Sequence, residues 1–272
     1  MRRFAPIVIA AASMVALAEV ASAADIPTKA PVYKAPPAAS STWTGWYLGV
    51  NAGGNWGTSE TSTSVAPPAV APAVSAAGAA LINALGQPAK INTSGFVGGL
   101  HGGYNYQISQ WLVGLEGEFD YFHSAGSRRA SSVGLGPGAT VIVNSSMSTD
   151  WLFTLRPRVG WVSNNWLFYG TGGLAVTQLK GAWSFSNPGG VPALSEAAAA
   201  SSTKAGWALG GGVETMLPGR WVVGAEYLYV NFGNISATSF SVTGAGVTFT
   251  NPFSHSADLS ANIVRARLSK LF

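Results

Sequence analysis

The chain has no cysteine among its 272 residues, and only 10% of its residues are charged. Without thiols it has no disulfide framework, no thiolate-bound metal and no cysteine nucleophile. Charged residues make up about 25% of an ordinary soluble domain, so this composition is poorly suited to a surface that faces water on all sides. Lysine and arginine never cluster beyond pairs, which argues against nucleic acid as a partner.

What the chain has in excess is glycine and aromatic residues. It contains 34 Gly, 10 Trp, 8 Tyr and 12 Phe, and 47% of its residues are hydrophobic. This composition is too apolar for a disordered chain. It suits a β structure that faces a solvent other than water.

The first part of the chain has the three regions of a secretory signal peptide. Arg2 and Arg3 precede an apolar run over residues 4–18, and Ala21 and Ala23 form a small-residue cleavage site. An uncleaved anchor helix is the alternative, but the apolar run is too short for it. We therefore expect residues 1–23 to be a signal peptide and the mature protein to be exported.

The rest of the chain divides into two parts. Residues 24–42, rich in Pro, Ala, Ser and Lys, are expected to form a periplasmic linker, and residues 43–272 to form a single β domain. Residues 65–85 are also apolar, but three prolines interrupt them, which excludes a membrane helix. We expect a loop there, with a short helix over residues 73–85.

Eight segments of the β domain alternate between apolar and polar residues, which is the period-two pattern of strands. Each has at least 12 residues, and a strand that crosses a membrane needs about 9–11. The pattern predicts an all-β fold, an eight-stranded antiparallel transmembrane β-barrel of the outer membrane. The segments are 45–56, 95–107, 110–122, 150–162, 165–181, 203–216, 220–231 and 257–272.

The connections between these segments alternate in length, as in barrels with short periplasmic turns and longer extracellular loops. The short ones lie near residues 108–109, 163–165 and 217–219. We expect the long ones to be loops outside the cell. They cover residues 57–94, 123–149, 182–202 and 232–256.

The parity of the residues indicates which face meets lipid. In segment 150–162, Trp151 and Trp161 share one face, and Arg156 and Arg158 lie on the other. Aromatic residues at both ends of an apolar face are typical of the two girdles where a barrel meets the headgroups. A soluble, lipocalin-like barrel is the alternative, but it does not explain why every short turn falls on one rim.

The inward-facing charges are the one constellation that parity brings together. Glu116 and Glu118 are expected to face Arg156 and Arg158, and Lys204 is expected to add a fifth base nearer the outer rim. A balanced network either plugs the narrow lumen of eight strands or simply fills it. The predicted lumen network consists of Glu116, Glu118, Asp120, Arg156, Arg158, Glu214, Glu226, Arg265 and Arg267.

A network of this size predicts a lumen that is closed to most solutes, although the inward glycines have no side chains and leave part of the lumen unfilled. Replacing Glu116 and Arg156 together by alanine is expected to open a small conductance.

Catalytic chemistry is scarce in this sequence. His101 faces the lumen by parity, and His123 and His255 fall in predicted loops. No pattern brings a serine, a histidine and an acid together, as a hydrolase requires, so we expect no enzyme. Three scattered histidines without cysteine also predict no metal site and no cofactor.

Several stretches resemble the family of small Gram-negative outer-membrane immunogenic proteins, porin-family β-barrels related to the OmpA-type membrane domain. Beginning at Trp43, Leu155, Leu167, Thr203 and Glu226, they read WTGWYLGV, LRPRVGW, LFYGTGGL, TKAGWALGGGVE and EYLYVNFG. The resemblance covers nearly all of the mature chain. It implies an eight-stranded barrel that the outer-membrane assembly machinery inserts and that serves as a surface antigen and envelope component.

Two features depart from that family, and one further feature fits it. Pro157 lies inside a predicted strand, where it donates no ladder hydrogen bond, and loop 57–94 is unusually rich in Ala and Pro. The last strand alternates to a terminal aromatic residue, interrupted by Lys270, and so resembles the family's assembly signal. The residues of this signal are Val264, Ala266, Leu268 and Phe272.

We therefore expect an outer-membrane barrel with a structural role in envelope integrity and a role as a surface antigen. Its expected partners are outer-membrane lipids, lipopolysaccharide and the assembly machinery. A small-solute porin-like channel is the alternative from another class, and an outer-membrane lipid hydrolase is a distant one. The ligands of the loops and the oligomeric state stay open.

Overall fold

The computed structural model describes residues 42–66, 74–134, 139–189, 193–243 and 248–272. The chain divides into two compact units, Met1–Ser40 and Ser41–Phe272, and every described residue belongs to the second unit. The predicted signal peptide with its cleavage after Ala23, and nearly all of the predicted linker, lie outside the described residues and stay predictions.

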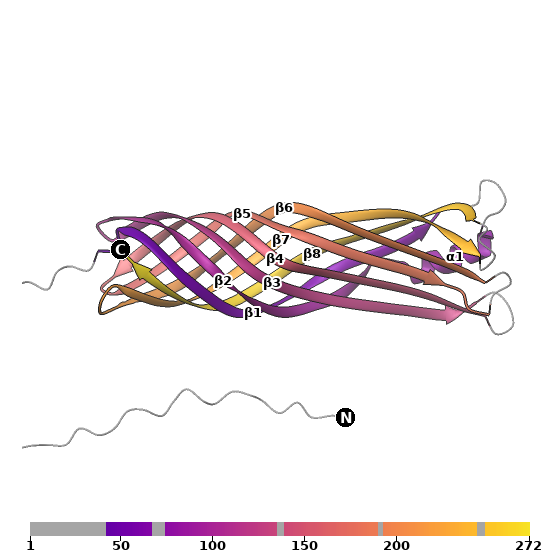
Figure 1. Cartoon of the computed structure of the whole chain (residues 1–272), viewed down its shortest axis with the longest axis horizontal. Coiled ribbons are helices and arrows are strands. Elements are labelled where there is room, and N and C mark those ends of the chain that lie inside the picture. Colours follow the sequence, from indigo (N-terminus) through magenta and orange to yellow (C-terminus); the bar gives the residue numbers. More distant parts are fainter. Residues whose placement is uncertain (1–41, 67–73, 135–138, 190–192, 244–247) are drawn as a thin grey trace, which may run out of the picture. The chain divides into compact units, whose positions relative to one another are not determined.

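Eight antiparallel strands form one closed barrel, in which each strand pairs with the next along the chain and the last pairs with the first (Figure 1). This confirms the barrel predicted from the sequence. The strands are β1 (Gly45–Val65), β2 (Ala89–Ile108), β3 (Trp111–Val133), β4 (Thr140–Ser163), β5 (Trp166–Ser186), β6 (Leu194–Leu217), β7 (Trp221–Thr243) and β8 (Thr248–Leu271).

Three short turns join the strands at one end of the barrel, the turn end, where β8 also finishes. They connect β2 to β3, β4 to β5 and β6 to β7, as the sequence predicted. Each turn holds a residue in the left-handed region: Ser109 with φ 57°, Asn164 with φ 53° and Arg220 with φ 60°. Such residues reverse the chain within two or three positions, in keeping with the twist of the strands. The opposite end, where the other connections lie, is the loop end.

The prediction of long loops is wrong over most of their length, because the strands continue through these residues. Along residues 140–149 of β4, every inward side chain is buried and every outward one is half-exposed, as in a regular strand. A hydropathy pattern misses this alternation because the outward residues are mostly Ser, Thr and Asn, and because inward positions include Ser145 and Thr149. The strands therefore extend well beyond the segments predicted from the sequence.

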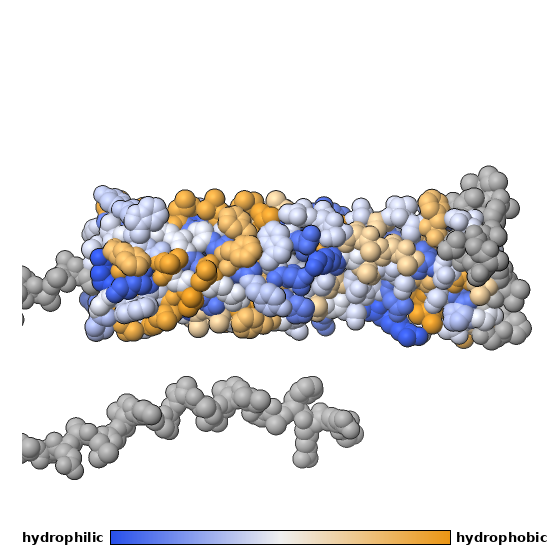
Figure 2. Space-filling view, viewed as in Figure 1, coloured by the Kyte–Doolittle hydropathy of each residue, from blue (hydrophilic) through white to orange (hydrophobic). Residues whose placement is uncertain are grey.

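The apolar outer surface covers only the half of the barrel next to the turn end, the turn half. Trp46 and Trp111 are exposed at its lower margin, and Trp56 and Tyr121, ten residues along the same strands, are exposed at its upper margin. Ten tilted residues rise about 25 Å, the height of the apolar band of an outer-membrane barrel. In Figure 2, orange side chains gather over this half, and most of the other half is pale or blue.

The polarity of the two faces inverts in the loop half. There the outer face is mostly polar, and the lumen is packed with apolar side chains. Strands of 20–24 residues reach about 50–60 Å at a typical tilt, roughly twice the height of the apolar band, so the loop half lies beyond this band. Its inner core includes Val97, Phe122, Met147, Leu152, Leu179, Trp183, Leu228, Phe232, Leu259 and Ile263.

One short helix, α1 (Ala76–Leu85), lies at the loop end, as the sequence predicted for residues 73–85 (Figure 1). The Ser75 side chain caps it by accepting a hydrogen bond from a backbone N–H of the first turn. Ala79 and Ile82 are buried against inward apolar side chains of the strands, so the helix packs on the apolar core at this end of the barrel. Within the described residues, no helix has the length and apolarity to span a membrane.

Pro157 is accommodated in β4 by an interrupted ladder. It pairs with Leu115 of β3 in unbroken register. On the β5 side, neither Arg156 nor Pro157 has a partner, and pairing resumes in the same register at Arg158 and Thr171. The Thr171 hydroxyl donates a hydrogen bond of 2.9 Å to the Pro157 carbonyl. The missing N–H of the proline therefore needs no bulge at this position.

Candidate functional site

The inward charged side chains of the turn half form one buried network at the height of the apolar belt. They reach the lumen from β3, β4, β6, β7 and β8, because side chains alternate between the two faces of each strand. The structure brings all nine residues of the predicted network together, each at most 3% exposed. They are Glu116, Glu118, Asp120, Arg156, Arg158, Glu214, Glu226, Arg265 and Arg267.

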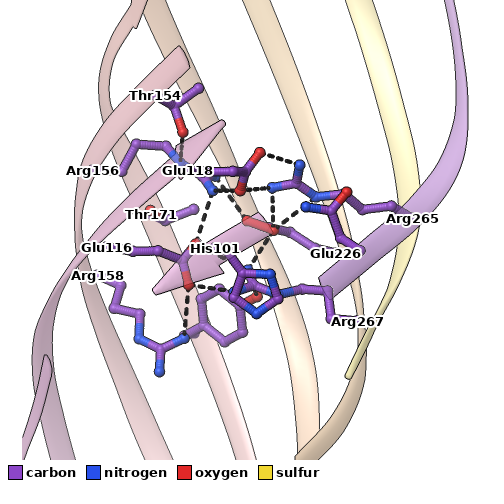
Figure 3. A network of polar contacts seen from close by, with 12 residues as sticks. His101, Glu116, Glu118, Thr154, Arg156, Arg158, Thr171, Glu226, Arg265 and Arg267 are labelled. Carbon is purple, nitrogen blue, oxygen red and sulfur yellow. Dashed lines mark hydrogen bonds and ion pairs between the residues drawn. The ribbon is translucent and has the colours of Figure 1, made fainter. Parts of the chain in front are cut away.

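Arg156 on β4 lies at the centre of this network (Figure 3). Its Nη2 is 2.9 Å from Glu116 Oε1 and 2.9 Å from Glu118 Oε2. Its Nη1 is 2.8 Å from Glu226 Oε1, and its Nε donates to the Thr154 hydroxyl at 3.1 Å. One guanidinium therefore joins three carboxylates from β3 and β7.

Arg265 and Arg267 on β8 complete the pairing. Arg265 contacts Glu118 and lies 2.8 Å from Glu226. Arg267 contacts Glu116 and lies 2.6 Å from Glu226. Each of these glutamates therefore has at least two arginine partners. This matters because a buried charge that loses its partners is strongly destabilising.

Towards the turn end, Arg158 lies against two tyrosine rings. Its guanidinium carbon is 4.5 Å from the centre of the Tyr47 ring and 5.2 Å from that of Tyr169. Its Nη1 is 3.5 Å from Glu214 and 3.6 Å from Glu116. The Tyr47 hydroxyl donates to Glu116 at 2.8 Å. The rings thus fill the space below the network and also bind its charges.

The network contains five acids and four arginines, which corrects the predicted equality of acids and bases. Lys204, the expected fifth base, is half-buried in the loop half of β6 and makes none of the network's ion pairs. Neutral groups supply further donors. At the upper edge of the network, Asp120 is 2.9 Å from Arg265 and accepts a hydrogen bond of 2.9 Å from the Asn51 amide.

Three carboxylates of the network come close enough to bind a metal ion. Glu116, Glu118 and Glu226 each offer an oxygen within 4.8 Å of the others. Arg156 already contacts all three at 2.8–2.9 Å and brings the positive charge that a metal would bring. We therefore assign no metal or cofactor to the described residues of this network.

Apolar layers close the lumen on both sides of the network. The inner core of the loop half lies above it. Below it, a cavity lined by residues that include Trp43 and Asn105 is only about 10 Å³, at the lower limit for one water molecule. The layer at the turn end consists of Trp43, Tyr47, Leu112, Val162, Leu167, Tyr169, Met216, Val222 and Leu271.

A second polar cluster lies in the loop half, and sequence reasoning missed it. His255 Nε2 on β8 is 3.1 Å from Glu196 Oε1 on β6 and 3.2 Å from Ser239 Oγ on β7, and the serine hydroxyl also donates to Glu196. Thr63 Oγ1 is 3.1 Å from the other ring nitrogen, Nδ1. A serine, a histidine and an acid do converge here, contrary to the prediction. The acid contacts the same nitrogen as the serine, so the arrangement is not that of a hydrolytic triad.

The other two histidines have partners of their own. His101 faces the lumen as predicted, and its Nε2 is 2.7 Å from Ser269 Oγ. His123 is half-exposed near the upper margin of the belt. Its ring stacks on Tyr121 with 7° between the planes, and its Nδ1 is 3.5 Å from Asp150. His123 is therefore on the surface, away from the lumen.

The predicted assembly signal is an outward row at the end of β8. Lys270, which interrupts the row, donates to the Gly219 carbonyl, and its Nζ is 5.3 Å from the centre of the Trp221 ring. Its ammonium group thus reaches the polar turn while its stem stays in the belt. The row consists of Val264, Ala266, Leu268 and the 65% exposed Phe272. Its role in assembly stays a prediction.

A closed antiparallel barrel with an apolar belt between aromatic margins and a charged interior defines the class of outer-membrane β-barrel proteins. The comparison with known families agrees. The chain matches the outer membrane protein beta-barrel domain family over residues 30–249, and it belongs to this family. It is therefore a protein of the outer membrane.

Its relatives confirm the family resemblance noted from the sequence. The chain is 33% identical to the 31 kDa outer-membrane immunogenic protein of Brucella melitensis over 225 residues, which cover 82% of each protein. It is 27% identical to the 25 kDa outer-membrane immunogenic protein of Brucella ovis over 254 residues, 92% of this chain and 100% of that one.

Solved structures of outer-membrane barrels are less similar. The outer membrane protein OprG from Pseudomonas aeruginosa has 13% identity and a TM-score of 0.39, over 84% of this chain and 97% of that one. The outer membrane protease OmpT from Escherichia coli has 6% identity and a TM-score of 0.43 over the same shares. At these scores neither structure informs on function.

Proposed function

We propose that this protein is a closed, non-enzymatic barrel that supports the integrity of the outer membrane and displays its loop half outside the cell as a surface antigen. The filled lumen carries this proposal. Buried ion pairs at mid-belt, with apolar layers on both sides, favour a structural role over a channel. The names of its relatives, outer-membrane immunogenic proteins, are in keeping with surface display.

The outer surface supports the same proposal. The apolar belt suits outer-membrane lipid, and its upper margin suits the headgroups of lipopolysaccharide. The loop half has a mostly polar exterior and stands clear of the belt, whereas the short turns leave little room for a binding surface. Barrels of this class place short turns in the periplasm. The assembly machinery is the expected partner during insertion.

Epitope tags test the topology. A tag between β3 and β4, in residues 134–139, should be reached by antibody on intact cells. A tag at Asn164, in the turn between β4 and β5, should stay silent until the outer membrane is breached. The opposite labelling pattern would overturn the topology.

Loss of the protein tests the envelope role. Cells that lack it should become more sensitive to detergents and large antibiotics, and expression of the wild-type chain should restore resistance. An unchanged barrier in cells without the protein would contradict a structural role. Solute flux into liposomes that contain the barrel would instead favour the small-solute channel.

A further inference from the structure

The cluster of Glu196, Ser239 and His255 in the loop half leaves a buried charge without an arginine or lysine. Glu196 is 4% exposed, and within the described residues its ion-pair partner is His255. Its second oxygen, Oε2, is buried and has no hydrogen-bond partner. Because a buried carboxylate is costly without a compensating cation, this site differs from the arginine-rich network below it.

Three ligand atoms of the cluster converge on one point. His255 Nε2 is 3.1 Å from Glu196 Oε1 and 3.2 Å from Ser239 Oγ, and the two oxygens are in hydrogen-bond contact. A tetrahedral zinc ion with bonds of about 2.0–2.1 Å holds its ligand atoms roughly 3.3–3.4 Å apart. An ion therefore requires the three ligand atoms to move apart, above all the serine and glutamate oxygens, and Glu196 Oε2 offers a further oxygen.

The surroundings of His255 allow a tautomer whose Nε2 lone pair is directed at Glu196. Thr63 pairs with His255 across β1 and β8, and its hydroxyl lies 3.1 Å from Nδ1. When Nδ1 donates to this hydroxyl, Nε2 and Glu196 Oε1 are two acceptors that face each other, and a cation between them removes the repulsion. Metal-binding histidines are usually oriented by such a hydrogen bond on the other nitrogen. The Trp183 ring, stacked with its centre 5.4 Å from that of the imidazole, fixes the ring plane.

We propose that Glu196, Ser239 and His255 bind a divalent transition-metal ion of the zinc class, with water completing the coordination. Imidazole and carboxylate ligands suit zinc, copper and nickel. β6 and β7 leave their ladder between Ser195 and Trp207, and Glu196 lies at the upper end of this stretch beside the half-buried Ser239.

Calorimetric titration tests this site. Full-length barrel, folded in detergent and treated with a chelator, is titrated with zinc chloride at neutral pH. Wild type should bind one equivalent saturably, and Glu196→Gln and His255→Ala should lose this binding. Thr63→Val removes only the orienting hydroxyl and should weaken binding by about tenfold. The heat-dependent gel shift of each variant shows that it is folded.

Two histidine variants serve as controls. His101→Ala removes a buried histidine of the turn half, and His123→Ala removes an exposed histidine beside Asp150. Both should retain the wild-type affinity. Zinc should also raise the unfolding midpoint of wild type but not of the folded Glu196→Gln variant.

Two outcomes would overturn the proposal. The first is wild type that shows no saturable zinc binding and whose unfolding midpoint zinc does not change. The second is binding that persists in Glu196→Gln but disappears in His123→Ala. This result would place the ion on the outer surface.

Discussion

Arg156 of β4 and Glu226 of β7 form an ion pair inside the barrel, with Nη1 2.8 Å from Oε1 and both side chains fully buried. Their strands are not neighbours in the ring, so this contact joins two separate parts of the wall. It lies in the membrane-embedded half, where the outer face has only lipid to pack against. The closed lumen and the stability of the barrel therefore depend on the same side chains.

Removal of Arg156 should be strongly destabilising. Arg156→Ala leaves three glutamates each with one arginine fewer, and breaking a buried pair costs about 3–5 kcal/mol. Urea unfolding of the barrel in lipid vesicles measures this cost. Asp150→Asn, which breaks the exposed pair with Lys180, is the control and should cost about 0–1 kcal/mol. An Arg156 variant as stable as this control would contradict the central position of Arg156.

Purified barrel in planar bilayers should pass little or no steady current. The sequence alone predicts that Glu116→Ala with Arg156→Ala opens a small conductance. The structure changes this expectation, because apolar layers above and below the network remain in the double variant. We expect it to stay closed even when Trp43→Ala is added, because the inner core of the loop half still fills the lumen above the network. A large, stable wild-type conductance would instead favour the channel.

The edge of the apolar belt can be located with two arginine substitutions on β3. Leu115 faces outward near mid-belt, and Ser127 is exposed on the same strand in the loop half. Leu115→Arg should cost about 2–4 kcal/mol, because it places a charge at the bilayer midplane. Ser127→Arg should cost within about 0.5 kcal/mol. Equal costs, measured by urea unfolding in vesicles, would show that the membrane does not end between the two positions.

Deletion of Phe272 should lower the amount of barrel in the outer membrane, since it removes the aromatic end of the outward row on β8. Phe272→Tyr retains an aromatic ring and should assemble like wild type. Immunoblots of membrane fractions, combined with protease digestion, measure the assembled fraction. Normal levels and normal protease resistance after the deletion would refute an assembly role for this residue.

Much of the turn half could be predicted because lipid and lumen impose opposite demands on neighbouring residues. Trp151 and Arg156 differ so strongly in polarity that their parity identifies the strand and both of its faces. Strand order then places Glu116 near Arg156. The loop half was mistaken for loops because its outer face is mostly polar and serines occur on both faces of its strands. There the difference between inward and outward residues is too small for a pattern to reveal.

The sequence by itself determined the class of fold, the number of strands, the positions of the short turns and the inward direction of nine charged residues. Only the tertiary structure decided that Arg156 reaches Glu226 and that Glu196 meets His255. The odd or even position of a residue along its strand shows which face its side chain occupies. It does not show the height of that side chain in the lumen or its partner on the opposite wall. Those depend on the register and tilt of all eight strands together, which the closure of the barrel sets as a whole.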